Sequence, residues 1–396
     1  MSRNVVIASG VRTAIGDFGG SLAGISPCDL AASVAREAIA RAGIAPSDVG
    51  QTVFGHVIHT APEDMYISRV AAISAGVPET SPALTLNRLC GSGLQAIVTA
   101  AEQILLGNAD ITLAGGAESM SRAGHLLTQA RHGQKMGDTL ALDMMTGALT
   151  DPFGNGHMGI TAENISQRAG IDRAAQDAFA LESHKRAAHA LAEGRFVDQI
   201  LPLTVKQGRK EFVFDTDEHV RADVSLADLA KLRPAFRKDG TVTAGNASGI
   251  NDAGAAVVLM EEGVAEARGV APIGRIVAYG LGGVAPEVMG LGPVPAVKQA
   301  LQRAGLAVSD IDVIESNEAF AVQACAVSAE LGFAPEKVNP NGGAIALGHP
   351  VGASGAIILI KALYELKRTG GRYGLATMCI GGGQGIAVIV ENPAHG

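Results

Sequence analysis

Along the chain, segments with the apolar spacing of a helix alternate with short apolar segments typical of strands. Residues 94–106 carry apolar side chains at 94, 97, 98, 101, 104 and 105, a helical spacing that predicts a helix with Gly107 as its C-cap. The other elements expected in the first 120 residues are a strand at 4–8, a helix at 29–41 that stops at Gly43, mixed strand and loop at 49–58, and a short strand at 111–113 running into Gly115 and Gly116. Strands that alternate with helices predict α/β layers.

An internal repeat divides the chain into two halves. Residues 41–49 (RAGIAPSDV) recur as residues 303–311 (RAGLAVSDI), an offset of 262. The same offset pairs Ser92-Gly93 with Ser354-Gly355, and residues 111–115 with 373–377, while residues 6–10 resemble 276–280 at an offset of 270. Several matches in the same order predict two homologous α/β halves, packed as a five-layered α-β-α-β-α sandwich if each sheet is covered on both faces.

Residues 121–245 have no counterpart in the second half and are expected to form an inserted loop domain. The N-terminal half is then 1–120 plus about 246–270, and the C-terminal half is 271–396. The insertion contains a predicted helix from Asp172 as N-cap to Glu193, ended by Gly194. It also carries methionines at 136, 144, 145 and 158, which indicate a local core, a cover for a long flexible ligand, or a subunit contact.

Composition removes several classes of function. The net charge of −8 argues against nonspecific binding to nucleic acid or to a membrane surface. Aromatic residues make up 4% of the chain and Trp is absent, so stacking platforms for bases are not expected. The amino terminus has no apolar stretch typical of a secretory signal, and four scattered cysteines suggest neither zinc nor a disulfide framework. We therefore expect a cytoplasmic protein without a metal.

Glycine is the compositional outlier, with 51 of 396 residues against a typical share of about 7%. Several glycines surround Cys90, which stands in the segment Asn87-Arg-Leu-Cys-Gly-Ser-Gly93 directly before a predicted helix. A thiol at a helix N-terminus is near free amide donors and the positive end of the dipole, which favour the thiolate. The alternative is a buried structural cysteine, the more common fate of a single cysteine.

Two further loops in the second half carry candidate chemistry. His349 lies in the glycine-rich segment 339–355, which the repeat places where the first half has Cys90, so a pseudo-twofold axis would bring the thiol and a candidate base together. Cys379 precedes Gly381-Gly-Gly, whose bare amides could bind an anion. Alternatively, His349 is a solvated loop residue and Cys379 a buried thiol beside a turn.

Two polar loops complete the candidates. Asn317 follows a predicted strand and could hold a water molecule for an oxyanion, or could satisfy its own turn. The loop 245–252 could line a narrow passage or form a tight turn. Eight basic residues between 206 and 238 could meet a phosphate-bearing ligand, but interleaved acidic residues favour a mixed-charge surface. Nucleotide-binding, HExxH and EF-hand motifs are not found.

Taken together, these motifs resemble those of the thiolases. Asn87-Arg-Leu-Cys-Gly-Ser-Gly-Leu-Gln is similar to the family's acyl-carrying cysteine motif, the segment Asn339-Pro-Asn-Gly-Gly-Ala-Ile-Ala-Leu-Gly-His-Pro to its histidine motif, and Met378-Cys-Ile-Gly-Gly-Gly-Gln-Gly to its second cysteine motif. Asn317-Glu-Ala-Phe and Gly245-Asn-Ala-Ser-Gly match two further loops. The resemblance spans essentially the whole chain and is closest to the short-chain biosynthetic enzymes and broad-specificity β-ketothiolases.

The resemblance implies a role for each candidate. Cys90 would carry the acyl group, His349 would accept a proton from Cys90 or CoA, and Cys379 would exchange the α-proton. A water molecule held by Asn317 would form one oxyanion hole with His349. The backbone amides of Cys90 and Gly381 would form the other. No tightly bound cofactor is implied, because coenzyme A acts as substrate and product.

The resemblance also implies a set of CoA-contacting positions, namely His157, Met158, Arg221, Ala244, Ser248, Ala319 and Phe320. Two positions depart from the family pattern. Asp228 stands where relatives often have a serine near the adenine end of CoA, and Gly124-His125 replaces a common Pro-Tyr. The first departure puts a contact with CoA in doubt, and the second suggests that this loop differs.

The sequence therefore predicts an acyl-CoA:acetyl-CoA C-acyltransferase. It would condense acetyl-CoA with a short acyl-CoA, or cleave 3-ketoacyl-CoA with CoA, by ping-pong chemistry through acyl-Cys90. The alternatives are a decarboxylating 3-ketoacyl synthase of the same superfamily, against which Cys379 argues, and a non-catalytic carrier of acyl-CoA or lipid. The family likeness implies a homo-oligomer, a dimer of dimers, with residues 121–145 as the expected tetramer contact.

Overall fold

The computed structural model describes residues 3–395; residues 1, 2 and 396, at the outer ends of the two predicted halves, lie outside the described residues. Its central feature is an eleven-stranded sheet whose main path is β15-β16-β17-β14-β1-β13-β5-β3-β4. The strands of the first half are β1 (Val5–Thr13), β3 (Gln51–Gly55), β4 (Ala83–Leu86), β5 (Ile111–Ser119) and β13 (Asn251–Glu261). Those of the second are β14 (Gly274–Gly283), β15 (Val313–Ser316), β16 (Tyr373–Ile380) and β17 (Gln384–Glu391).

The two halves meet where β1 pairs with β14 in antiparallel register, Val6 opposite Arg275 and Ile7 opposite Gly274. From this seam the strand order runs outwards with matching connections on both sides. β3 and β15 start 262 residues apart, at 51 and 313, as do β5 and β16, at 111 and 373. The repeat found in the sequence is therefore a structural duplication.

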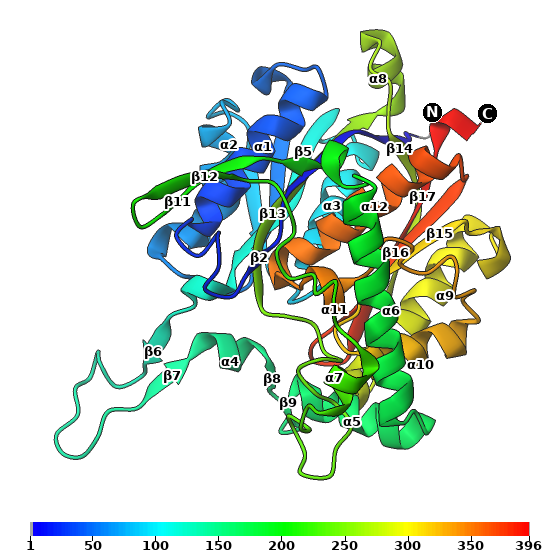
Figure 1. The fold of residues 1–396 in the computed structure, drawn as a ribbon. Helices are drawn as coiled ribbons and strands as arrows, with labels where there is room; N and C mark the ends of the chain where they lie inside the picture. The colour runs from blue at the N-terminus through cyan, green and yellow to red at the C-terminus, as the bar shows by residue number, and fades with distance from the viewer. Residues whose placement is uncertain (1–2, 396) are drawn as a thin grey trace.

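Helices cover both faces of each half-sheet (Figure 1). On one outer face lie α1 (Pro27–Arg41) and α2 (Ile67–Ser74), and on the other lie α9 (Pro293–Ala304) and α10 (Ala321–Leu331). Between the two half-sheets, α3 (Ser92–Leu105) packs against α12 (Val351–Thr369). In α12, 15 of 19 residues are buried, as expected of a helix that is enclosed on all sides. The predicted five-layered sandwich is confirmed.

One predicted strand end is wrong. The strand expected at 111–113 continues through Gly115 and Gly116 to Ser119. A Cβ atom at 115 would lie 2.1 Å from the Ala255 carbonyl oxygen, and one at 116 would lie 2.0 Å from the carbonyl oxygen of Gly352. These glycines therefore permit close packing within the sandwich and do not end the strand.

The segment 121–245 forms a long excursion from the body of the molecule. It begins with a projecting arm (Figure 1), a hairpin of β6 (His125–Leu127) and β7 (Ala141–Asp143), so residues 124 and 125 lie at its base. The remaining elements of the excursion are α4 (Met144–Ala148), β8 (Thr150–Asp151), β9 (Gly156–His157), α5 (Met158–Ala169), α6 (Arg173–Ala192), β10 (Ile200–Leu201), β11 (Leu203–Gln207), β12 (Lys210–Phe214) and α7 (Leu226–Ala230). Asp172 caps α6 as predicted.

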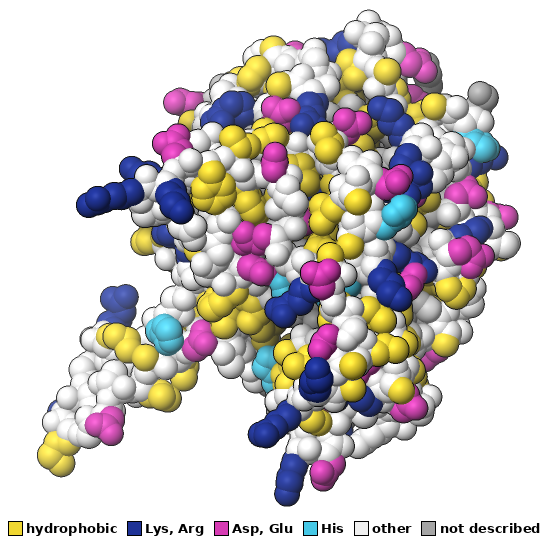
Figure 2. Space-filling model, in the orientation of Figure 1, with side chains coloured by type: hydrophobic (Ala, Val, Ile, Leu, Met, Phe, Trp, Pro, Cys, Tyr) yellow, Lys and Arg dark blue, Asp and Glu magenta, His cyan; other side chains and the backbone are white. Residues whose placement is uncertain are grey.

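The shorter elements that connect these layers are β2 (Gly16–Asp17), α8 (Glu262–Arg268) and α11 (Ala344–Leu347). Basic and acidic side chains are interspersed over the face shown in Figure 2, and hydrophobic side chains are exposed along the arm. Met136, on the arm, is 89% exposed, whereas Met158 is buried. The methionines of the excursion therefore do not form one cluster. Within residues 3–395 we find no helix with the length and apolar character needed to span a bilayer.

Candidate active site

A cavity of about 590 Å³ opens between the two halves and the excursion. Ten of the twelve residues predicted for the site line it: Cys90, His157, Met158, Arg221, Ala244, Ser248, Ala319, Phe320, His349 and Gly381. The other two, Asn317 and Cys379, are buried behind the wall of the cavity. The structure thus brings together residues that are up to 291 positions apart (381 − 90) in the chain.

Cys90 stands on a sharp turn between β4 and α3. Leu89 has a φ of +46°, a conformation that non-glycine residues rarely adopt. The Ser92 hydroxyl holds this turn, because it accepts from the Arg88 amide at 2.9 Å and donates to the Leu89 carbonyl at 2.6 Å. A Cβ at Gly91 would lie 2.5 Å from the side chain of Ile380. The turn presents Cys90 to the cavity while its neighbour packs against the other half.

The Cys90 thiol is not the thiolate that its place before a helix suggested. Burial raises its pKa to about 11, and the charge of Glu118 raises it further, while the amides of Gly381 and of Cys90 itself oppose the shift. Desolvation thus outweighs the effect of the helix N-terminus on the pKa of Cys90. Cys90 therefore rests as a neutral thiol at pH 7.

His349, which lines the same cavity as Cys90, has the hydrogen-bonding pattern of a proton acceptor. Its Nδ1 lies 2.6 Å from the Ser354 hydroxyl, and this hydroxyl lies 2.8 Å from the Pro350 carbonyl. Because the hydroxyl hydrogen is donated to Pro350, Nδ1 carries the imidazole hydrogen and Nε2 bears the lone pair. The Asn317 amide lies 3.4 Å from Nε2. Burial lowers the pKa of His349 to about 4, so the ring is neutral at pH 7.

Cys379 lies at the end of β16, directly behind Cys90. It is 1% exposed, and burial raises its pKa, which a thiolate at Cys90 would raise further. The turn that follows requires glycine, since Gly382 and Gly383 have φ of +83° and +89°. This turn places Gly381 so that its amide faces the Cys90 sulfur. Two thiols, one imidazole and one backbone donor therefore converge.

An aromatic slot lies at the other end of the cavity. The rings of His157 and Phe236 stack with their centroids 4.7 Å apart, and Phe320 meets Phe236 edge-on at 6.2 Å. A Cβ at Gly159 would lie 2.2 Å from the Phe236 ring, so this glycine leaves room for it. Phe236 was not predicted from the sequence. A signal was available, because phenylalanine is rare in this chain, with ten in 396 residues, and Phe236 lies within the stretch of basic residues at 206–238.

Asp228 does not line the cavity. Its carboxylate is bonded to the Ser225 hydroxyl at 2.5 Å and to the Lys231 ammonium at 3.0 Å on the short helix α7. These two partners hold the pKa of Asp228 below its usual range. The carboxylate is therefore paired locally with Ser225 and Lys231, and its relation to the adenine end of CoA stays a prediction.

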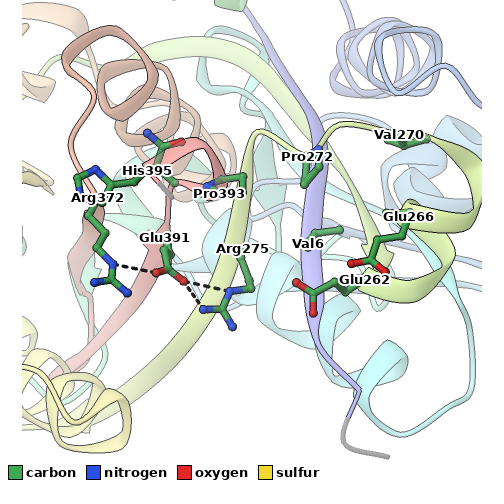
Figure 3. A pocket seen from close by; sticks show the side chains of 12 residues that line it. Val6, Glu262, Glu266, Val270, Pro272, Arg275, Arg372, Glu391, Pro393 and His395 are labelled. Atoms are coloured by element: carbon green, nitrogen blue, oxygen red, sulfur yellow. Dashed lines mark hydrogen bonds and ion pairs between the residues drawn. The ribbon is translucent and has the colours of Figure 1, made fainter.

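A second cavity of about 570 Å³ lies at the seam where β1, β14 and the end of β17 meet (Figure 3). Glu391 dominates it, held by Arg275 and, at 3.0 Å, by Arg372. Its lining contains no cysteine. Within residues 3–395, moreover, no group of His, Cys, Asp and Glu is arranged to hold a metal ion. The cavity at Cys90 is therefore the candidate for covalent chemistry.

Comparisons with known proteins agree with this geometry. Residues 5–263 match the model of the thiolase N-terminal domain, and residues 270–392 match that of the thiolase C-terminal domain. The chain is 62% identical over 392 residues to the beta-ketothiolase BktB of Cupriavidus necator, with 99% of this chain and 100% of that protein covered.

Solved structures give the same result. The Bacillus anthracis acetyl-CoA acetyltransferase superposes with a TM-score of 0.97 at 46% identity, covering 99% of both chains. Human mitochondrial 3-ketoacyl-CoA thiolase in complex with CoA superposes with a TM-score of 0.96 at 42% identity, covering 98% of both chains. With both domain models matched across the two halves and close relatives over the full length, the chain belongs to the thiolase family.

Proposed function

We propose that this thiolase catalyses the reversible Claisen condensation of acetyl-CoA with a short acyl-CoA, and in reverse the thiolysis of 3-ketoacyl-CoA by CoA, through an acyl-Cys90 thioester. One observation carries the proposal. Cys90 faces a cavity that also holds His349 and the Gly381 amide, with Cys379 behind it. A decarboxylating synthase does not account for this second thiol, and a carrier accounts for none of the reactive groups.

The first half-reaction is acyl transfer. Cys90 sulfur attacks the thioester carbonyl of acyl-CoA while its proton passes to His349 Nε2, and collapse of the tetrahedral intermediate expels CoA, which leaves as a thiol with that proton. The amides of Cys90 and Gly381, which face the Cys90 sulfur, would stabilise the oxyanion. One such donor contributes about 3–4 kcal/mol to lowering the barrier, and the neutral resting thiol makes this stabilisation necessary.

The second half-reaction forms the carbon–carbon bond. For this step the Cys379 proton would first pass to His349, which is neutral again once CoA has left. The Cys379 thiolate then removes the α-proton of acetyl-CoA, and the resulting carbanion attacks the acyl carbon on Cys90. This forms 3-ketoacyl-CoA and releases the Cys90 sulfur, which takes the proton back from His349, so that both thiols are restored. The enolate oxygen would be stabilised by His349 and a water molecule held by Asn317, which lies 3.4 Å from Nε2. Because burial raises the pKa of Cys379, its thiolate is a strong base once it has formed, and this oxyanion hole would lower the pKa of the α-carbon that it deprotonates.

CoA would occupy the cavity from its mouth to Cys90. His157, Met158, Arg221, Ala244, Ser248, Ala319 and Phe320, together with Phe236, are its proposed contacts. The cavity wall is mostly apolar, which suits a pantetheine arm, and Arg221 supplies positive charge for a phosphate. CoA enters and leaves as a substrate, and no resident cofactor is proposed.

Organisation beyond the site stays a proposal. We divide the chain into a first half of residues 1–120 plus about 246–270, an inserted loop domain at 121–245, and a second half at 271–396. The projecting arm suits a contact between subunits because Leu126, Leu127 and Leu142 are exposed there, in keeping with a dimer of dimers. A cytoplasmic location is likewise proposed.

Thiolysis of acetoacetyl-CoA by CoA tests the proposed reaction, followed as loss of 3-ketoacyl-CoA absorbance. Wild-type protein should consume the substrate and form two acetyl-CoA, and Cys90→Ala should neither turn over nor form a covalent acyl-enzyme. Malonyl-CoA with acetyl-CoA is the matched test of the synthase alternative. Release of CO₂ without any thiolysis would overturn the proposal.

A further inference from the structure

Two buried side chains of the first half accept hydrogen bonds from the turn that carries His349 in the second half. We infer that Asn251 and Glu118 are positioning residues, which fix the His349–Gly352 turn, residues 349–352, so that Nε2 of His349 faces Cys90. Neither residue lines the cavity. The inference rests on the proposed role of His349 and goes further, since it names what sets the separation of a thiol and a base that lie on different halves.

Asn251 begins β13 and has no exposed surface. Its side-chain oxygen accepts from the backbone amide of His349 at 2.9 Å. Its side-chain nitrogen donates to the Gly16 carbonyl at 3.1 Å and to the Asp17 carboxylate at 3.3 Å. With acceptors on one side and an N–H on the other, the amide can adopt one orientation only. The catalytic turn is thereby anchored to β2 and β13.

Glu118, near the end of β5, holds the other end of the same turn. Its Oε2 accepts from the Gly352 amide at 2.9 Å and from the Val57 amide at 3.1 Å, and its Oε1 accepts from the Ile58 amide at 3.1 Å. The side chain is fully buried. Gly352 is the second residue of α12, so the carboxylate also faces the positive end of a 19-residue helix. Glu118 thus links the N-terminus of α12, which follows His349, to the cavity wall at Val57 and Ile58.

Three glycines make these contacts possible. A Cβ at Gly348, where φ is +108°, would lie 2.4 Å from the Asn251 side chain. A Cβ at Gly352 would lie 2.5 Å from Glu118 Oε2, and one at Gly116 would lie 2.0 Å from the Gly352 carbonyl. The backbone of the turn therefore packs directly against both side chains.

This packing matters because Cys90 and His349 have no covalent or sheet connection near the site. Cys90 follows β4 in the first half, and His349 precedes α12 in the second. Asn251 and Glu118 reach across this boundary at residues 349 and 352, the two ends of the turn. A displacement of about 1 Å in a reacting group can cost on the order of 100-fold in rate, so loss of either contact should reduce proton transfer without removing any group that touches substrate.

The experiment measures exchange of labelled CoA into acetyl-CoA, which needs Cys90 and His349 but no carbon–carbon step. Asn251→Ala and Glu118→Ala should each lower kcat by about 10- to 100-fold with KM within about twofold. Glu118→Gln should keep more activity than Glu118→Ala, because an oxygen at the Oε2 position still accepts from Gly352. Asn392→Ala is the matched control. Asn392 is also buried and bonded to two carbonyls, but it lies by the distant cavity, so its loss should leave kcat unchanged.

A double-mutant cycle with His349→Ala separates positioning from general destabilisation. If Asn251 acts through His349, its substitution should change the residual exchange rate of His349→Ala less than twofold. Glu118 is left out of this cycle because its charge also raises the pKa of Cys90 directly. The inference is overturned if Asn251→Ala lowers the rate as much in that background as in wild type. It is also overturned if Glu118→Ala and Asn251→Ala, folded by circular dichroism, exchange at the wild-type rate. Failure of the proposed function looks different, since His349→Ala itself would then retain full activity.

Discussion

Acidification tests the protonation state that the structure gives to His349. Burial lowers its pKa to about 4, roughly 2.5 units below an ordinary histidine. At pH 5, about 90% of His349 should still be neutral, against about 3% for a histidine with the ordinary pKa. The base for the first half-reaction should therefore stay available far below the pH at which most histidines become charged.

Exchange of labelled CoA into acetyl-CoA is the suitable assay, because it reports the half-reaction in which His349 is proposed to accept the Cys90 proton. Between pH 7 and pH 5, kcat/KM should fall by less than about twofold through this residue, with a steep acid limb only near pH 4. A half-maximal loss close to pH 6.5 would refute the reasoning. The Ser354→Ala variant, which removes the partner of Nδ1, should lower the rate without moving this limb to neutral pH.

The same pKa has a consequence for folding. The folded-state pKa of His349 is depressed, so the unfolded chain binds more protons in the window between about pH 6.5 and pH 4. The stability contributed by the neutral, buried ring is thus present above pH 6.5 and is lost as pH falls through 4, by ~3 kcal/mol in total. Urea unfolding of wild type and His349→Gln should show this difference in slope, and parallel pH dependences would contradict it.

Three further predictions concern packing and binding. Asp217→Ala leaves the fully buried Arg12 without its ion-pair partner and should lower the free energy of unfolding by about 3–5 kcal/mol in urea titrations; a loss below about 1 kcal/mol would argue that water reaches Arg12. Phe236→Ala removes the ring that stacks on His157 and should raise KM for CoA about tenfold, with kcat little changed; an unchanged KM would remove this slot from the CoA site. Asp228→Ser should change KM for CoA by less than about twofold, since the carboxylate is exposed and locally paired; a large fall in KM would place the charge near CoA after all.

Most of the fold could be predicted from local residue patterns and from the internal repeat. The helix at 29–41 and the Asp172 cap depend on neighbouring residues, and the structure has both. The duplication placed Cys90 and His349 at related turns, so that their meeting could be predicted from symmetry before any contact was known. The end of β5 was predicted wrongly because a glycine pair is ambiguous in sequence. Whether it ends a strand or accommodates α12 depends on residues more than 200 positions away.

The supports of the site could not be predicted in the same way. Glu118 and Gly352 are 234 residues apart, and Asn251 and His349 are 98 apart, with no local pattern to connect them. The resting state of Cys90 was also misjudged. The sequence shows the helix that follows the thiol and its favourable dipole, but not the depth of burial that raises the pKa to about 11.

We propose that Cys90 carries the acyl group and that Cys379 exchanges the α-proton, and the Cys379→Ala variant separates these two roles. Cys379→Ala should be mixed with acetyl-CoA, and the intact protein and its Cys90 peptide should be examined by mass spectrometry beside the rate of acetoacetyl-CoA formation. We expect close to one acetyl group per chain on Cys90, normal exchange with CoA, and condensation slowed by about 100- to 10,000-fold. Condensation at the wild-type rate, or failure of Cys90 to acquire the acetyl group, would contradict it.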